Sequence, residues 1–207
     1  MIEQRSDSWF QCRAGKVTAS RLGDLMATTK SGPSASRKNY IAQLVVERMT
    51  GQPASSYSNA AMQWGVDTEP MARARYELVT GRDVVEEGFI VHPEIADAGA
   101  SPDGLVGDDG MLEIKCPTSA THIETLLHAA IDRKYMLQMQ FQMACAKRQW
   151  VDFVSFDPRM PDDHQIHIQR VSRDDKMIAE IEKAVTEALS EIEGTIARLN
   201  DRLREAA

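Results

Sequence analysis

Apolar residues spaced three or four positions apart predict several helices along this chain. The apolar stripe over residues 37–50 ends at Gly51, a residue type that commonly terminates helices. A second predicted helix over residues 60–80 contains Pro70, which we expect to bend it or restart it just after Glu69. Further helices are predicted around Leu22 with Thr18 or Ser20 as N-cap, over residues 121–130, from Arg133, and from Ser172 onward.

Alternation of apolar and polar residues predicts the strands. Residues 150–156 and 165–171 alternate clearly, and residues 87–92 form another candidate strand. Residues 101–115 predict a β-hairpin, because the sequence G-D-D-G at 107–110 is a strong turn signal between two short apolar runs.

The order of these elements predicts an α/β fold, in which helices flank a central mixed β-sheet. The opening segment before Thr18 is predicted to be a loop, and residues 30–36 a flexible loop rich in Ser, Gly and Pro. With 207 residues, of which 43% are hydrophobic and 27% charged, we expect a single domain over residues 1–207.

Composition also excludes several classes of protein. No apolar run approaches the length of a membrane span and no signal peptide opens the chain, so we expect a cytoplasmic protein that does not associate with membranes. Cys12, Cys116 and Cys145 lie far apart without a C-x-x-C pair. A disulfide framework, a zinc site and an iron–sulfur cluster are therefore disfavoured.

The net charge of −7 argues against a protein that coats DNA non-specifically. The charge is unevenly distributed, however. Residues 1–50 hold eight Lys and Arg against four Asp and Glu, whereas residues 51–110 hold three against eleven. Part of the acidic excess thus lies where candidate metal ligands occur, which leaves a nuclease open.

The predicted hairpin carries the pattern P-D…E-x-K in Asp103, Glu113 and Lys115. If the turn lies near its centre, Asp103 pairs roughly opposite Glu113 and Ile114, and Glu113 and Lys115 share one strand face while Leu112 and Ile114 point into the core. Two carboxylates and an ammonium would then converge, a set suited to Mg²⁺ and phosphate chemistry. The alternative is a hairpin with a solvated charged face.

Four further residues have both a functional and an ordinary interpretation. Arg13 could contact a phosphate near the start of the short helix, but it could equally be a surface charge, with Ser20 only a helix cap. Glu69 could point toward the hairpin or toward solvent. Gln138, which shares a helix face with Gln142, could hold a water or a phosphate oxygen or form ordinary helix surface.

Six motifs, in order along the chain, resemble the lambda exonuclease family of phage recombination nucleases, within the wider PD-(D/E)xK group. They are W-x-x-x-R-x-G-x-x-T-A-S at 9–20, W-G-x-x-x-E at 64–69, S-P-D-G-L at 101–105, L-E-I-K-C-P at 112–117, Y-M-x-Q-x-Q at 135–140 and D-P-R-M at 157–160. The resemblance spans residues 5–190 and implies a restriction-endonuclease-like core.

The resemblance also implies roles for the candidate residues. Asp103, Glu113 and the main-chain carbonyl of Ile114 would ligate Mg²⁺, for which Mn²⁺ would substitute, and Lys115 would position the attacking water.

Four other residues receive roles from the same resemblance. Glu69 and Gln138 would complete the catalytic site, and Arg13 and Ser20 would match the family's pocket for the 5′-phosphate at a DNA end.

At the level of the whole protein, the resemblance implies a 5′→3′ double-strand DNA exonuclease that leaves 3′ single-strand overhangs. It further implies a ring-shaped homotrimer around DNA, a single-strand annealing protein as partner, and a phage or prophage origin. An endonuclease of the same fold, or a catalytically inactive module that binds DNA ends, are the alternatives.

Overall fold

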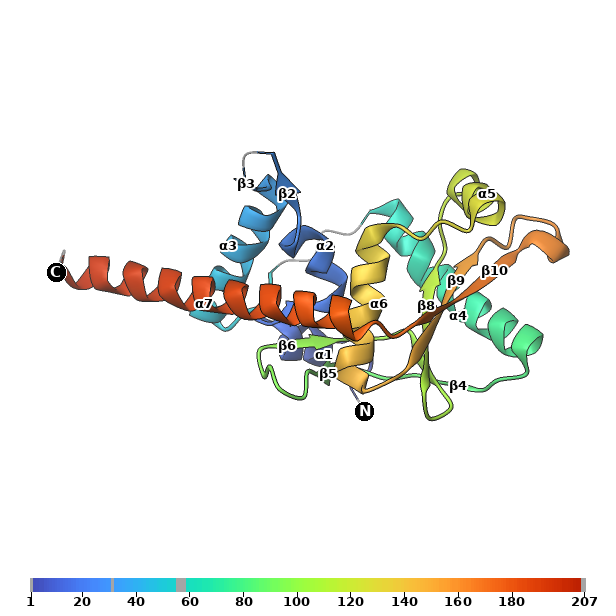
Figure 1. The fold of residues 1–207 in the computed structure, drawn as a ribbon, viewed down its shortest axis with the longest axis horizontal. Coiled ribbons are helices and arrows are strands. Elements are labelled where there is room, and N and C mark those ends of the chain that lie inside the picture. The colour runs from blue at the N-terminus through green and yellow to red at the C-terminus, as the bar shows by residue number, and fades with distance from the viewer. Residues whose placement is uncertain (1, 31, 55–58, 206–207) are drawn as a thin grey trace.

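A five-stranded mixed sheet forms the centre of the protein, as Figure 1 shows for the computed structural model, which describes residues 2–30, 32–54 and 59–205. The strands follow the order β10-β9-β8-β7-β4. Strands β8 and β9 are parallel and the other neighbours are antiparallel, which confirms the predicted mixed sheet. The bounds are β4 (Val84–Val85), β7 (Gly104–Val106), β8 (Gly110–Lys115), β9 (Trp150–Phe156) and β10 (Ile166–Ser172).

Two smaller sheets lie outside this centre. Strand β6 (Ala98–Ala100) pairs in parallel with β1 (Val17–Thr18) and antiparallel with β5 (Ile90–Val91). Strands β2 (Thr28–Thr29) and β3 (Gly32–Pro33) pair with each other, and β3 lies in the segment predicted to be a loop. Ser31 of that predicted loop lies outside the described residues.

Most helix boundaries follow from capping residues. The helices are α1 (Asp7–Arg13), the 3₁₀ turn η1 (Ala19–Arg21), α2 (Leu22–Leu25), α3 (Ala35–Thr50), α4 (Ala60–Thr80), α5 (Ser119–His128), α6 (Arg133–Ala146), the 3₁₀ turn η2 (Asp162–His164) and α7 (Asp175–Glu205). Side chains of Ser34, Asn59 and Thr118 accept hydrogen bonds from the first turns of α3, α4 and α5. Gly51 and Gly81 end α3 and α4 in the left-handed conformation, each at φ +66°.

One local prediction was wrong and two hold only in part. The opening segment contains helix α1, whose N-cap is Ser6, although none of its residues is buried. Helix α4 continues through Pro70 instead of restarting after Glu69. Ser20 lies inside η1, and Thr18 occupies the N-cap position without a side-chain capping bond.

Strand β8 is enclosed on both faces of the sheet. On one face Leu112 and Ile114 pack with Ala72 and Tyr76 of α4, and on the other Met111 packs with methionines of α6. Leu112 and Ile114 therefore point into the core as predicted. Because side chains alternate, Glu113 and Lys115 belong to the Met111 face, toward α6.

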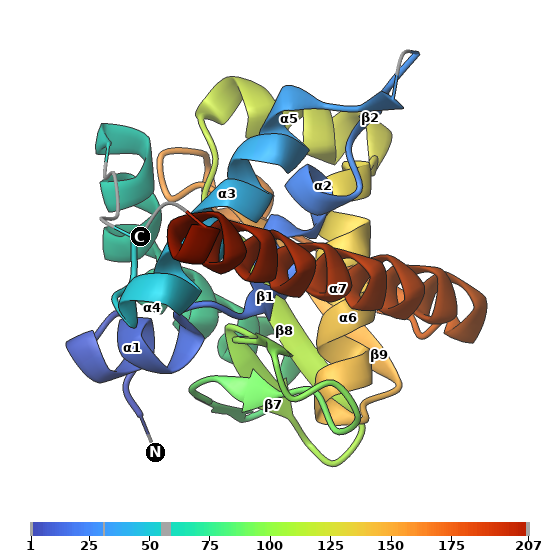
Figure 2. The ribbon, with the colours of Figure 1, turned by 90° about the vertical axis from the view of Figure 1, so that its left-hand side faces the viewer.

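Helix α7 packs against α2, α3 and α6, and Figure 2 shows it crossing the molecule in front of them. Its buried residues are Ile178, Ile181, Val185, Ala188 and Ile192, so its last turns extend past the apolar core. In the described part of the chain, no helix is both long enough and apolar enough to span a membrane.

Candidate active site

The β7–β8 hairpin places Asp103 opposite Glu113 and Ile114. Gly104 pairs with Leu112 in register, and the backbone N–H of Asp103 donates to the Leu112 carbonyl at 3.2 Å. One residue further, the backbone N–H of Ile114 donates to Oδ2 of Asp103 at 2.7 Å. The predicted pairing is confirmed, and the carboxylate of Asp103 is fixed by the opposing strand.

Glu113 is fully buried, and among the described residues its side chain accepts hydrogen bonds from donors on β8 and α6. Its Oε1 accepts from the Lys115 ammonium and from Nε2 of Gln138 at 2.7 Å. Its Oε2 accepts from Nε2 of Gln142 at 2.7 Å. A buried carboxylate held by two amides and an ammonium has a fixed orientation.

Gln142 is the site residue to which the sequence patterns gave no role of its own. Its position one helical turn after Gln138 was the available signal. Among the described residues no donor contacts its Oε1 atom, so its side chain makes a single described hydrogen bond, the one to Glu113.

Charges in this centre perturb one another strongly. Burial and the neighbouring Glu113 raise the pKa of Asp103 well above its usual range. Burial alone would lower the pKa of Lys115, but Glu113 and Asp103 raise it above its ordinary value. Lys115 is therefore an ammonium at neutral pH, suited to orient water or offset phosphate charge rather than to act as a free base.

The donor set fits a hard divalent cation. The carboxylates of Asp103 and Glu113 are adjacent, and burial together with repulsion from Glu113 disfavours the ionised form of Asp103. A bound cation would offset this repulsion. The carbonyl of Ile114 lies between Glu113 and Lys115 along the same strand. In the described ranges, this centre included, no three Asp, Glu, His or Cys side chains form a metal cluster, so binding of the Mg²⁺ type through two carboxylates fits better than a zinc cage.

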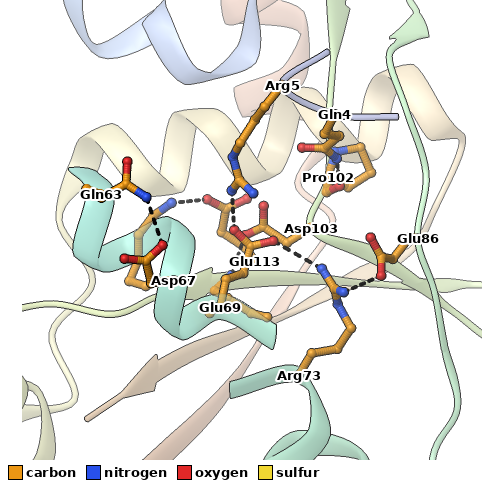
Figure 3. A network of polar contacts seen from close by, with 12 residues as sticks. Gln4, Arg5, Gln63, Asp67, Glu69, Arg73, Glu86, Pro102, Asp103 and Glu113 are labelled. Carbon is orange, nitrogen blue, oxygen red and sulfur yellow. Dashed lines mark hydrogen bonds and ion pairs between the residues drawn. The ribbon is translucent and has the colours of Figure 1, made fainter. Parts of the chain in front are cut away.

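Glu69 faces this centre from α4. Its side chain is 13% exposed and pairs with Arg73 at 3.1 Å and with Arg5. Figure 3 shows Glu69 and Asp103 pointing toward each other, with Arg5 entering between them from the N-terminal segment. The structure therefore brings Glu69 to the hairpin, as the functional interpretation expected, and adds Arg5, for which no sequence pattern gave a signal.

Arg5 has an unfavourable backbone conformation, with φ at +69°. For a residue other than glycine the left-handed conformation costs about 1–2 kcal/mol. Its side chain is 43% exposed, and a partly exposed ion pair such as that with Glu69 contributes only about 0–1 kcal/mol. The ion pair alone does not offset the backbone cost.

A separate pocket of about 530 Å³ contains both Arg13 and Ser20. The Arg13 guanidinium lies 3.9 Å from the ring centroid of Trp9. Burial lowers the pKa of Arg13 to about 10, so it remains a cation at neutral pH. Lys16 and Arg21 also line the pocket, which has the charge that an anion requires.

Three consecutive residues connect this pocket to the carboxylates. The hydroxyl of Ser101 accepts from Nη1 of Arg13 at 3.2 Å and from Nε1 of Trp9 at 3.0 Å. Pro102 follows, and its carbonyl accepts from the side chain of Gln4 at 2.8 Å. Asp103 comes next, so the two sites lie at either end of one short segment.

Comparisons with known proteins identify relatives of this chain. Residues 8–149 match the model of the YqaJ-like viral recombinase domain. The chain is 52% identical to LHK-Exo, an alkaline exonuclease from Laribacter hongkongensis, over 98% of this chain and 100% of that one. Crystal structures of LHK-Exo superpose with TM-scores of 0.90 and, in complex with dAMP, 0.91.

A phage related exonuclease from Haemophilus somnus 129PT shares the fold, with a TM-score of 0.67 and 17% identity over 89% of this chain and 96% of that chain. No curated protein gives a significant match. The predicted α/β core of the restriction-endonuclease type is confirmed by these structures.

Proposed function

The chain belongs to the YqaJ-like viral recombinase family and is a nuclease, and from this premise we propose that it degrades one strand of duplex DNA in the 5′→3′ direction from a phosphorylated end. The observation that carries the proposal is the segment 101–103, which joins a cationic pocket to the half-buried carboxylate of Asp103 and the buried carboxylate of Glu113. A nuclease that starts at an end needs both an end-binding site and a cleavage centre at a fixed separation.

The residues of the cleavage centre divide the chemistry among them. Asp103 and Glu113, with the Ile114 carbonyl, would hold Mg²⁺ or Mn²⁺. When bound, the ion would neutralise phosphate charge and lower the pKa of water. Gln138 orients Glu113.

Lys115 and Glu69 act on the water and on the phosphodiester. Lys115, which remains charged, positions the attacking water and offsets the charge that develops on the phosphoryl oxygens. Glu69 completes the group of carboxylates around the same space.

The bond that breaks determines whether the reaction can repeat. Water attacks the phosphorus that follows the terminal nucleotide, the bond from phosphorus to the 3′-oxygen breaks, and the 3′-oxygen takes up a proton. The terminal nucleotide leaves, and the next nucleotide keeps the phosphate. The new end is again 5′-phosphorylated, and Arg13 and Ser20 can bind it as they bound the first.

The proposal extends to the assembly in which this reaction occurs. A homotrimer that encloses the duplex would retain the DNA between cuts, and the 3′ single strands left behind would be substrates for a single-strand annealing protein in phage recombination. Sedimentation of the purified protein tests the trimer, since a monomer has a mass of 23.1 kDa.

A digestion time course with Mg²⁺ on three DNAs tests the activity. The substrates are a linear duplex with 5′-phosphates, the same duplex with 5′-hydroxyls, and a covalently closed circle. Progressive loss of one strand from the phosphorylated duplex, with an intact circle, is the expected result. Nicking of the circle would indicate an endonuclease, and no cleavage of any substrate by folded protein would indicate a DNA-binding module.

A further inference from the structure

The N-terminal segment crosses the cleavage centre and delivers one guanidinium into it. We propose that Arg5 binds a phosphodiester of the DNA strand as that strand enters the active site, leaving Glu69 for the phosphate when DNA is present. The inference rests on the proposed function, because it requires that DNA occupies the space beside Asp103.

The segment is held firmly on either side of Arg5. The side chain of Gln4 donates to the carbonyl oxygens of Glu87 at 2.7 Å and Pro102 at 2.8 Å. A Cβ on Gly88 would lie 2.6 Å from the carbonyl oxygen of Ile2, so the two backbones are in direct contact there. After Arg5, Ser6 caps helix α1. The backbone is therefore fixed before and after the left-handed residue.

Glu69 does not depend on Arg5 for a cationic partner. Arg73, one turn later on α4, pairs with the same carboxylate and also with Glu86, and its side chain is 15% exposed. The side chain of Arg5 is 43% exposed and its described ion pair is with Glu69 alone. Arg73 thus has the geometry of a structural partner, whereas Arg5 is a second cation at the open side of the same carboxylate.

The chemistry of the centre favours a phosphate as the second partner of Arg5. Figure 3 shows the guanidinium directed toward Asp103 and Glu69, where the proposed reaction places a phosphodiester. Guanidinium groups bind phosphate through two parallel N–H donors, which an ammonium cannot do. A divalent cation bound by Asp103 and Glu113 would draw the same phosphate toward this position. The backbone strain at Arg5 is consistent with a residue retained for a ligand.

Substitution by glycine separates a ligand-binding role from a structural one. Arg5→Gly removes the guanidinium and also relieves the left-handed backbone, so a structural measure and a functional measure should move in opposite directions. Arg5→Lys keeps the positive charge but lacks the two parallel N–H donors of a guanidinium. Arg204→Ala removes a cation at the far end of α7, where the side chain is 82% exposed, and is the control for lost charge.

Three measurements are made on each variant: kcat/KM on the 5′-phosphorylated duplex with Mg²⁺, binding of the same duplex with Ca²⁺ at several salt concentrations, and Tm of the free protein. For Arg5→Gly we expect at least a tenfold lower kcat/KM, an unchanged or higher Tm, and a slope of log K against log salt that is smaller by about one. Arg5→Lys should retain part of the activity, and Arg204→Ala should match the wild type in all three.

Unchanged kcat/KM and salt slope in Arg5→Gly would overturn the proposal. A lower Tm with an unchanged salt slope would also overturn it, because that result assigns Arg5 to holding Glu69. Failure of the wild type to digest any DNA would contradict the proposed function instead. The salt dependence of binding needs no cleavage and still decides the role of Arg5 in that case.

Discussion

Ile114 donates its backbone N–H to the carboxylate of Asp103 at 2.7 Å. The position of this carboxylate in the centre therefore depends on the strand register of the hairpin. A slip of one residue would turn Glu113 and Lys115 to the opposite face of the sheet. The turn at residues 107–110, which contributes no side chain to the centre, therefore determines whether the carboxylates of Asp103 and Glu113 meet at all.

Asp103→Ala should abolish DNA cleavage, by at least about 10³-fold, because the centre loses a ligand for the cation. The fold should persist, with Tm unchanged or higher, since the variant removes a carboxylate whose charge is disfavoured by the neighbouring Glu113. Differential scanning fluorimetry should show that Mg²⁺ raises Tm of the wild type but not of the variant. The exposed turn variant Asp108→Ala should behave as wild type. Full activity of Asp103→Ala would refute the site.

Gln142→Ala should lower kcat at least about tenfold, because Oε2 of Glu113 loses its 2.7 Å hydrogen bond and the carboxylate can rotate. We also expect a stability loss of about 1–3 kcal/mol for the unpaired buried carboxylate oxygen. The matched control is Gln140→Ala, on the same helix and equally buried, whose side chain bonds Ser172 and Asp174 instead.

Urea denaturation and initial rates well below Tm separate the two glutamine variants. Gln140→Ala should lose stability but keep kcat, whereas Gln142→Ala should lose both. Equal kcat values in the two variants would show that Gln142 has no positioning role.

Arg13→Lys should impair cleavage of 5′-phosphorylated duplex by about tenfold or more while leaving the slower cleavage of 5′-hydroxyl duplex unchanged. The physical reason is that a lysine keeps the charge but loses the stacking on Trp9 at 3.9 Å and the two-donor contact with phosphate. The measurement is the ratio of kcat/KM for the two ends. An equal loss on both ends would place Arg13 outside the end pocket.

Arg159→Ala should make the protein less stable at neutral pH but not at low pH. Burial raises the pKa of Asp157, but hydrogen bonds from Arg159 and Ser119 more than compensate and lower it to about 2. A carboxyl group whose pKa is depressed on folding stabilises the protein above its unfolded pKa of about 3.9, and this contribution is lost as pH falls toward 2. Because the Arg159 side chain is 47% exposed, solvent screens the pair and we expect only a small loss of stability.

Urea denaturation of both proteins at pH 7 and near pH 2 checks this prediction. The difference in free energy of unfolding should shrink at the lower pH. A difference of the same size at both pH values would indicate lost packing of Arg159 on Trp64, where the guanidinium lies 4.5 Å from the ring centroid, instead of the loss of a charge pair.

The hairpin was predictable because its signals are local. The turn residues at 107–110 and the alternation up to Lys115 determine both the strand pairing and the face on which Glu113 lies. The mixed sheet followed from strands with equally clear alternation at 150–156 and 165–171. Gly51 likewise located the C-terminal end of α3, whereas the helix begins after its cap Ser34, two residues before the predicted start at residue 37.

The features that were missed depend on contacts distant in sequence. Helix α1 buries no residue, so no apolar stripe marks it. Arg5 pairs with Glu69 while its own backbone is left-handed and the preceding Gln4 is fixed by hydrogen bonds. No sequence pattern indicates that geometry. Gln142 becomes a partner of Glu113 through the packing of α6 on β8, whereas on sequence alone the same amide could lie on an ordinary helix surface.

The bridge formed by Ser101 has a consequence for the size of each cut. Its hydroxyl is bonded to Arg13 and Trp9 of the end pocket, and Asp103 follows after a single proline. Two residues of extended chain span about 7 Å, and a proline restricts how that length can vary. In the proposed reaction the separation between bound end and scissile bond is therefore set by this short segment and by the hydrogen bonds of Ser101 to the end pocket. Because this separation is the same in every cycle, we expect each cut to remove the same number of nucleotides.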